Sequence, residues 1–236
     1  MKRTKIICTM GPNTDDEEMM RKLAKAGMDI ARFNFSHGDH EEQKTRMDLL
    51  KKVRKELKLP IAILLDTKGP EIRTGILEGG QKVYLEEGSQ FTLTTEQIEG
   101  NNTRCSQTYK NLPKDVKEGD TILIDDGLIQ LTVENVTDTD VVCRVVNGGE
   151  LGQKKGINVP NVEVKLPAIT EQDKKDILFG IEQGIDFIAA SFVRNAEAIK
   201  EIKELLRVNG GERIDVIAKI ENAEGVHNID KIIKAA

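Results

Sequence analysis

The fold of this chain is decided by the stretch Ile61-Ala-Ile-Leu-Leu-Asp-Thr-Lys-Gly-Pro70, in which an apolar run ends in a polar turn. Five consecutive apolar residues indicate a short strand buried on both faces, as in a parallel sheet. Upstream, strand-like runs at 5–9 and 30–35 alternate with two helix-like segments, the first with Thr14 as its N-cap and the second covering about 39–57. This alternation predicts parallel strands covered by helices.

The alternation stops at Gly69-Pro70 and resumes after Pro167. The intervening residues show short β-type runs separated by turn signals such as Asp125-Asp-Gly127, without a convincing amphipathic helix. They predict a separate small β-barrel or sandwich inserted into the alternating unit. The expected domains are 1–70, with the first three βα units; 71–165, the inserted all-β domain; and 166–236, which continues to about a fifth strand and its following helix.

The length of the alternating part suggests a particular architecture. An eight-fold βα barrel takes about 250 residues, and the residues outside the insert suffice for about five of the eight units. The predicted fold class is therefore α/β, a (β/α)8 TIM-type barrel truncated after about five strands, with an inserted all-β domain.

Composition excludes several classes of function. The chain has 35 Lys and Arg against 40 Asp and Glu, a net charge of −5 that does not favour binding to a nucleic-acid backbone. Its apolar runs fall short of the about 20 residues that a membrane-spanning helix needs. Cys8, Cys105 and Cys143 are widely separated, so they indicate neither a disulfide framework nor a zinc site. We expect a cytoplasmic protein that binds neither nucleic acid nor membranes.

The second strand carries a polar stripe. In Ile30-Ala-Arg-Phe-Asn-Phe-Ser36, alternate residues point to opposite faces, so Arg32, Asn34 and Ser36 share one face. An exposed edge strand with an ordinary polar face is one interpretation. Within a parallel sheet, whose faces are usually both buried, the stripe is more readily explained as functional groups that point into a barrel.

Two other strands also end in polar residues. Asp66 and Thr67 directly follow the third strand, where barrel enzymes place functional groups, although a turn or capping role is an alternative for Asp66. Lys219 and Glu221 are two residues apart at the end of the fifth strand and share a face. In one interpretation they form an inward salt bridge. In the other, Lys219 meets a phosphoryl group and the carboxylate of Glu221 beside it binds Mg²⁺. Ser191, after the fourth strand, could equally be a plain strand-end serine.

Together these strand ends suggest phosphoryl transfer or enolate chemistry. Hydroxyl, amide and carboxylate oxygens with one net negative charge suit a monovalent cation, and Arg and Lys supply positive charge for a transferring phosphoryl group. The histidines show no metal-ligand spacing, and His40 is expected to be solvated near a helix start.

At these residues the sequence resembles the pyruvate kinase family. The matching segments are Thr4-Lys-Ile-Ile-Cys-Thr-Met-Gly-Pro12, Ala31-Arg-Phe-Asn-Phe-Ser-His-Gly38, Leu65-Asp-Thr-Lys-Gly-Pro-Glu-Ile-Arg-Thr-Gly75, Asp125-Asp-Gly-Leu-Ile129, Lys154-Lys-Gly-Ile-Asn-Val-Pro160 and Ile217-Ala-Lys-Ile-Glu-Asn222. The resemblance implies a (β/α)8 barrel with a lid domain after the third strand and a C-terminal effector domain. It also implies a glycolytic, homotetrameric enzyme that transfers the phosphoryl group of phosphoenolpyruvate to ADP, with Mg²⁺ or Mn²⁺ and K⁺ as cofactors.

The resemblance further implies a role for each matching site residue. Arg32 would contact the transferring phosphoryl group, with Asn34 also on the substrate side, and Lys219 would stabilise the transition state and the enolate. Glu221 would be one Mg²⁺ ligand. Arg73, and Lys155 on the lid, would approach the nucleotide phosphates, and the K⁺ ligands would be Asn34, Ser36, Asp66 and Thr67.

The sequence stops at Ala236, before the strand that brings the family's second Mg²⁺ carboxylate. The resemblance therefore implies that residues 1–236 alone are inactive. Two alternatives stay open from the sequence. One is another Mg²⁺-dependent, enolpyruvate-handling barrel, such as a lyase or aldolase, and the other is a short non-catalytic chain that binds a nucleotide or a partner protein.

Overall fold

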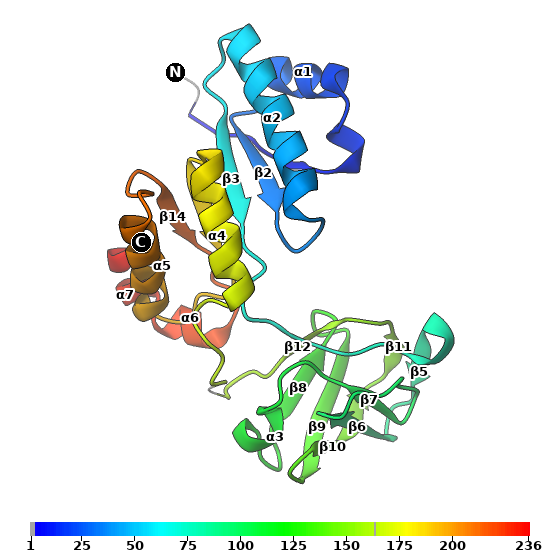
Figure 1. Ribbon diagram of the computed structural model, residues 1–236. Helices are drawn as coiled ribbons and strands as arrows, with labels where there is room; N and C mark the ends of the chain where they lie inside the picture. The colour runs from blue at the N-terminus through cyan, green and yellow to red at the C-terminus, as the bar shows by residue number, and fades with distance from the viewer. Residues whose placement is uncertain (1–2, 163) are drawn as a thin grey trace. The chain divides into compact units, whose positions relative to one another are not determined.

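The computed structural model describes residues 3–162 and 164–236 and divides into two compact units (Figure 1). The barrel unit comprises residues 1–70, 167–221 and 225–236, and the inserted unit comprises 71–166 and 222–224. Each unit has a hydrophobic core of its own. No helix in the described ranges is both long and apolar enough to cross a membrane.

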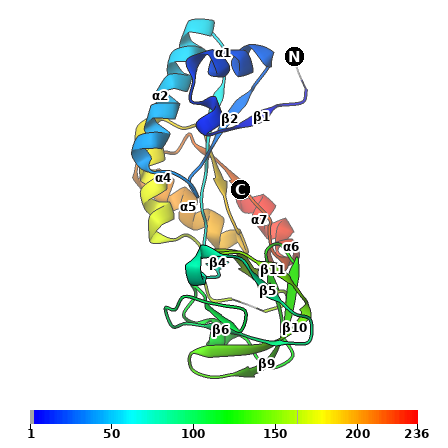
Figure 2. The same cartoon turned by 90° about the vertical axis from the view of Figure 1, so that its right-hand side faces the viewer.

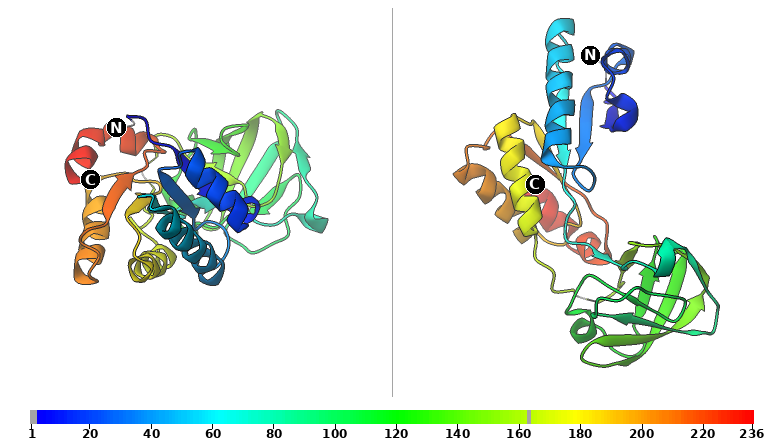
Figure 3. Two further views of the ribbon diagram at one scale, coloured as in Figure 1. Left: turned by 90° about the horizontal axis from the view of Figure 1, so that it is seen from above. Right: turned by 45° about the vertical axis from the view of Figure 1, so that its right-hand side comes forward.

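The barrel unit is built on a sheet of five parallel strands with the order β1-β2-β3-β13-β14. The sheet curls, and α2, α4 and α5 lie side by side along its outer face (Figure 3). This arrangement confirms the predicted α/β class, with the strands forming part of a TIM-type barrel. The strands are β1 (Ile7–Met10), β2 (Ile30–Asn34), β3 (Ala62–Asp66), β13 (Phe187–Ala190) and β14 (Asp215–Ala218).

The helices around this sheet are η1 (Pro12–Thr14), α1 (Glu17–Ala26), α2 (His40–Leu57), α4 (Glu171–Gln183), α5 (Ala196–Val208), α6 (Ala223–His227) and α7 (Ile229–Ala235). The expectation that Thr14 caps α1 is wrong. Pro12 starts a separate 3-10 turn that Thr14 closes on Gly11, and the side chain of Asp16 caps α1 by accepting from the amide of Met19 at 2.9 Å. Short polar side chains can cap either turn, so the sequence alone did not decide between them.

Strand β2 shows how the sequence separates core from site. Ala31 and Phe33 are fully buried in the hydrophobic core, whereas Arg32 and Asn34 on the alternate face are only partly buried. Because strand residues alternate between faces, the apolar positions pack under the helices and leave the polar ones on the inner face. Ile63 and Leu65 of β3 are likewise fully buried, as expected for a central parallel strand.

The inserted unit is a closed barrel, and Figure 2 shows its strands β6, β9 and β10. Its main sheet has seven strands in the order β4-β12-β8-β9-β10-β6-β7, and β5 pairs with β11 beside it. A bridge between Thr74 and Gln107 joins the two terminal strands, supported by a hydrogen bond from the amide of Gly75 to the carbonyl of Ser106 at 2.8 Å.

The strands of the inserted unit are β4 (Ile72–Arg73), β5 (Val83–Leu85), β6 (Gln90–Thr94), β7 (Arg104–Ser106), β8 (Thr121–Ile124), β9 (Ile129–Val136), β10 (Asp140–Asn147), β11 (Gly149–Leu151) and β12 (Gly156–Asn158). Two short turns of helix accompany them, η2 (Glu78–Gly80) and α3 (Leu112–Asp115). The single turn α3 was not predicted, because four residues are too few to show a helical period.

Candidate active site

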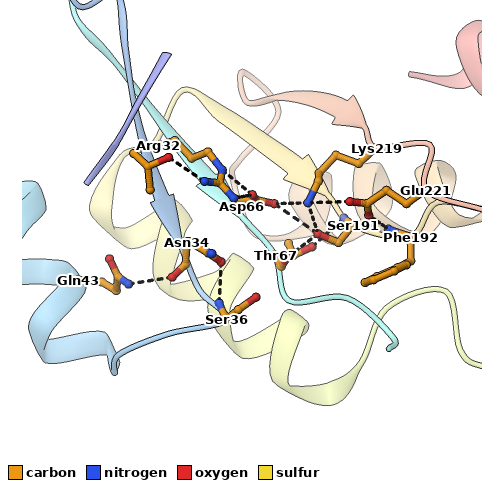
Figure 4. Close-up of polar contacts among 11 residues, drawn as sticks. Arg32, Asn34, Ser36, Gln43, Asp66, Thr67, Ser191, Phe192, Lys219 and Glu221 are labelled. Carbon is orange, nitrogen blue, oxygen red and sulfur yellow. Dashed lines mark hydrogen bonds and ion pairs between the residues drawn. The ribbon is translucent and has the colours of Figure 1, made fainter. Parts of the chain in front are cut away.

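Polar side chains gather at the carboxyl ends of four neighbouring strands of the barrel unit (Figure 4). Asn34 and Asp66, the last residues of β2 and β3, are paired in register across the two strands. Ser191 directly follows β13, and Lys219 directly follows β14. Because neighbouring parallel strands end at the same edge of the sheet, these side chains meet although they are far apart in the sequence.

Asp66 is the centre of this cluster and is 1% exposed. Its Oδ2 accepts from the guanidinium of Arg32, with Nε at 2.6 Å. Its Oδ1 accepts from the ammonium group of Lys219 at 3.0 Å. A buried carboxylate is costly unless it is paired, and here each oxygen has a cationic partner. The pairing fixes Arg32 and Lys219 on either side of one anchor.

Ser191 belongs to this network, although from the sequence a plain strand-end serine was an equally good interpretation. Lys219 Nζ donates to Ser191 Oγ at 2.8 Å, and the hydroxyl lies 2.5 Å from the carbonyl oxygen of Thr67. The amide of Ser191 donates in turn to Thr67 Oγ1 at 3.1 Å. Ser191 therefore ties Lys219 to the loop that follows β3. The only sequence signal for it was its position at the end of a strand.

Glu221 is held by a backbone contact that the sequence did not reveal. Its Oε1 lies 3.4 Å from Lys219 Nζ, and its Oε2 accepts from the amide of Phe192 at 2.8 Å. Phe192 has a φ of 55°, which is unusual for a bulky residue and directs its amide to Glu221. The inward pair between Lys219 and Glu221 is thus present, but it is one contact in a larger network.

A glycine is required where β3 leaves this network. Gly69 has a φ of 74°, and a Cβ built on it would lie 2.7 Å from the Cβ of Ser191. The amide of Gly69 donates to Asp173 Oδ1 at 3.0 Å, and Asp173 is fully buried in the first turn of α4. The loop after β3 is therefore fixed both by close packing and by a buried acceptor.

Asn34 ends β2 beside Asp66, and Ser36 lies in the loop that follows, between β2 and α2. The side-chain Oδ1 of Asn34 accepts from the amide of Ser36 at 3.0 Å. The amide of Phe35 donates to the carbonyl oxygen of Asp66 at 3.0 Å, which binds this loop to the end of β3. The oxygens of Asn34, Ser36, Asp66 and Thr67 therefore come from two adjoining strand ends.

Arg73 and Lys155 belong to the inserted unit, where each already has a carboxylate partner. Arg73 Nε lies 2.5 Å from Glu71 Oε1, and this contact with an accepting carboxylate raises the pKa of the Arg73 guanidinium above its ordinary value. Arg73 also donates to the carbonyl oxygen of Lys154 at 2.7 Å. Lys155 Nζ lies 2.9 Å from Asp125. Both cations are thus held in place within their own unit.

His40 is the first residue of α2 and 40% of its side chain is exposed, in line with the expectation of a solvated residue near a helix start, but its ring also has partners that were not predicted. Its ring stacks on Phe179 with 4.3 Å between ring centroids, and its Nε2 lies 2.6 Å from Asp176 Oδ1. Asp176 is 2% exposed and also accepts from Gln172 at 2.8 Å. His40 also joins α2 to α4, because a buried carboxylate on the facing helix gives its ring a partner that the sequence of α2 does not show.

Metal binding would rest on few carboxylates. Among residues 3–162 and 164–236, no cluster of three or more His, Cys, Asp or Glu side chains could hold a metal ion. Glu221 is the carboxylate at the open side of the cluster, with about a third of its side chain exposed. A divalent ion there would complete its coordination with oxygens from other ligands.

Comparison with known proteins places the whole chain in one family. The family model described as pyruvate kinase, barrel domain, matches residues 1–236. A protein named pyruvate kinase from Clostridium acetobutylicum is 53% identical over 237 residues, which cover 100% of this chain and 50% of that protein. Pyruvate kinases from Clostridium perfringens and Geobacillus stearothermophilus are 49% and 51% identical and are covered over 49% and 40% of their lengths. The chain spans about half or less of the length of these relatives.

Proposed function

The chain belongs to the pyruvate kinase family, and we propose that it forms part of an enzyme that transfers the phosphoryl group of phosphoenolpyruvate to ADP, giving pyruvate and ATP. The observation that carries the proposal is the pair of cations, Arg32 and Lys219, anchored on the buried carboxylate of Asp66. Phosphoryl transfer depends on fixed positive charge around the transferring group, with little covalent work for the protein. Such an anchored pair supplies that charge.

The anchoring of the two cations supports the roles that we propose for them. Arg32 presents a planar guanidinium, which suits the oxygens of a phosphoryl group, and Asp66 and the hydroxyl of Thr9 fix its orientation. Lys219 presents a compact charge that would stabilise the phosphoryl group in the transition state and the oxygen of the resulting enolate. Because both groups are held before substrate binds, little reorganisation is needed during the reaction.

The oxygens of Asn34, Ser36, Asp66 and Thr67 fit a K⁺ ion. Asn34 Oδ1 and Thr67 Oγ1 each accept one hydrogen bond and so retain a free lone pair. The charge of Asp66 is already shared between two cations, which favours a monovalent over a divalent ion. K⁺ would add one more positive charge beside the phosphoryl group.

A Mg²⁺ or Mn²⁺ ion would be held by Glu221 as one of its ligands. Phe192 and Lys219 orient that carboxylate, and divalent ions in kinases take one or two carboxylates together with substrate oxygens. When bound, the ion neutralises developing charge on the phosphoryl oxygens. The nucleotide phosphates would meet Arg73 and Lys155, which would exchange a carboxylate partner for a phosphate.

The test is the reaction itself, carried out with the full-length protein that contains this chain. Pyruvate should form from phosphoenolpyruvate only when ADP and a divalent ion are both present. The rate of pyruvate formation is measured by coupling it to the reduction of pyruvate. Turnover of a keto acid that is indifferent to ADP would contradict the proposal and favour a lyase or aldolase. The family resemblance further suggests a cytoplasmic homotetramer, which sedimentation and cell fractionation would check.

A further inference from the structure

Gln43, in the first turns of α2, is buried beside the loop that carries Asn34 and Ser36, and it is 3% exposed. Its side-chain nitrogen donates to the carbonyl oxygen of Asn34 at 3.1 Å and to that of His37 at 2.9 Å. Figure 4 shows the first of these contacts. One amide group thus ties both ends of the turn 34–37 to a helix.

The direction of the Gln43 amide follows from its partners. Both partners are carbonyl oxygens, which only accept, so the nitrogen must face them. The Oε1 atom then lies buried without a hydrogen-bond partner among the described residues. An unsatisfied buried acceptor is destabilising, and an apolar side chain of the same length would avoid it. The site therefore favours the two donated hydrogen bonds at the expense of local stability.

Inside the turn, the amide of Ser36 donates to Asn34 Oδ1 at 3.0 Å, and the amide of Phe35 donates to the carbonyl oxygen of Asp66 at 3.0 Å. The hydrogen bond from the amide of His37 to the carbonyl oxygen of Asn34 is long, at 3.4 Å. Gln43 is the side chain that joins the two ends of this turn, because it donates to the carbonyl oxygens of both Asn34 and His37.

We propose that Gln43 is a positioning residue that sets the affinity of the site for a monovalent cation. It touches neither substrate nor ion and acts by holding the turn that presents the oxygens of Asn34 and Ser36. This proposal rests on the proposed function, since it takes those two residues as cation ligands. Groups that orient metal ligands commonly account for roughly tenfold to a hundredfold in ion affinity.

The test replaces Gln43 by methionine, which has a similar length and no donor, in the full-length protein. The K⁺ concentration for half-maximal activity should rise roughly tenfold, with kcat at saturating K⁺ near that of the parent. Tl⁺, which substitutes for K⁺, gives a readout independent of activity, because its NMR signal reports binding directly. The matched control is Gln183→Met on α4, which removes an amide whose oxygen accepts from Lys51 at 3.3 Å, away from the site.

A second variant keeps the proposal testable if Gln43→Met folds poorly. Gln43→His retains one ring N–H, so its cation affinity should lie between those of the parent and Gln43→Met. Unchanged Tl⁺ and K⁺ affinity in folded Gln43 variants, with only the melting temperature lowered, would overturn the proposal and leave Gln43 a structural residue. A parent protein that forms pyruvate but shows no response to K⁺ or Tl⁺ would overturn the cation site while leaving the phosphoryl-transfer proposal intact.

Discussion

The sheets of the two units differ in how they end. In the inserted unit, the bridge between Thr74 and Gln107 joins the terminal strands β4 and β7, so the sheet closes on itself. In the barrel unit, β1 and β14 each pair on one side only within the described residues, and Ile7 and Ile217 on them are 51% and 40% exposed. Unpaired strand edges invite further strands. The terminal strands of the inserted unit are therefore joined to each other, whereas the sheet of the barrel unit has two edges at which another strand could pair.

The proposed site lies in the open unit. Its strand ends hold the buried carboxylate and the two cations anchored on it, whereas the cations of the inserted unit form carboxylate pairs at its surface. In a barrel, catalytic groups come from several strand ends around one rim. The comparison therefore predicts that changes at the rim affect rate, and that changes in the closed unit affect its own stability.

The largest effect is expected for Lys219→Met in the full-length protein. Removal of one preorganised contact to developing charge costs about 2.7–4 kcal/mol, or roughly a hundredfold to a thousandfold in rate. The loss should appear in kcat more than in KM, because the contact strengthens in the transition state. Steady-state kinetics of pyruvate formation measure both.

A matched control for that variant is Lys200→Met on α5, a lysine 68% exposed that pairs with Glu197 at 3.5 Å. A surface pair contributes about 0–1 kcal/mol to stability and should leave the rate unchanged. If Lys219→Met only raised KM, Lys219 would be a binding residue, and the rim would not concentrate the chemistry in the way the comparison requires.

The next prediction tests the sheet edges directly. Residues 71–166 expressed alone should fold as a monomer, because their sheet closes without other strands. Residues 1–236 should self-associate through the open edges of β1 and β14. Dispersed NMR shifts for the first protein and concentration-dependent sedimentation for the second would support this prediction. A random-coil spectrum for residues 71–166, or a monodisperse monomer of residues 1–236, would contradict it.

The sequence predicted the fold through residues whose local pattern and tertiary role agree. Ala31 and Phe33 alternate with Arg32 and Asn34, and the structure separates core from site along the same pattern. The resemblance named the family that the comparisons show. The individual roles of the site residues stay predictions.

What the sequence could not predict depends on contacts between distant elements. The partner of His40 is Asp176 on another helix, and Gln43 is a donor to carbonyl oxygens that any sequence would present. Phe192 contributes a backbone amide in an unusual conformation, which leaves no trace in residue type. Such contacts exist only after the sheet has assembled, so neither periodicity nor composition reveals them.

The smallest predicted effect concerns the closed unit at high pH. Burial raises the pKa of the Cys105 and Cys143 thiols from 9.0 to about 12 in the folded state. Above pH 9 the unfolded chain therefore releases protons that the folded unit retains, and stability falls as pH rises. At pH 10 each thiol should account for a loss of about 1.4 kcal/mol, since one pKa unit corresponds to 1.36 kcal/mol.

Pulse alkylation in urea measures this loss in the inserted unit, because both thiols are fully buried and react only when the unit opens. The midpoint of labelling should move to lower urea between pH 8 and pH 10. In Cys143→Ala, with Cys105 as the reporter, the pH-dependent part of the shift should fall to about half, even though the cavity lowers stability at both pH values. The change with pH therefore separates the thiol effect from the packing effect. A midpoint that did not move with pH would show that the two thiols ionise as readily in the folded unit as in the unfolded chain. The interior of the barrel would then be accessible to water, contrary to what its closed sheet implies.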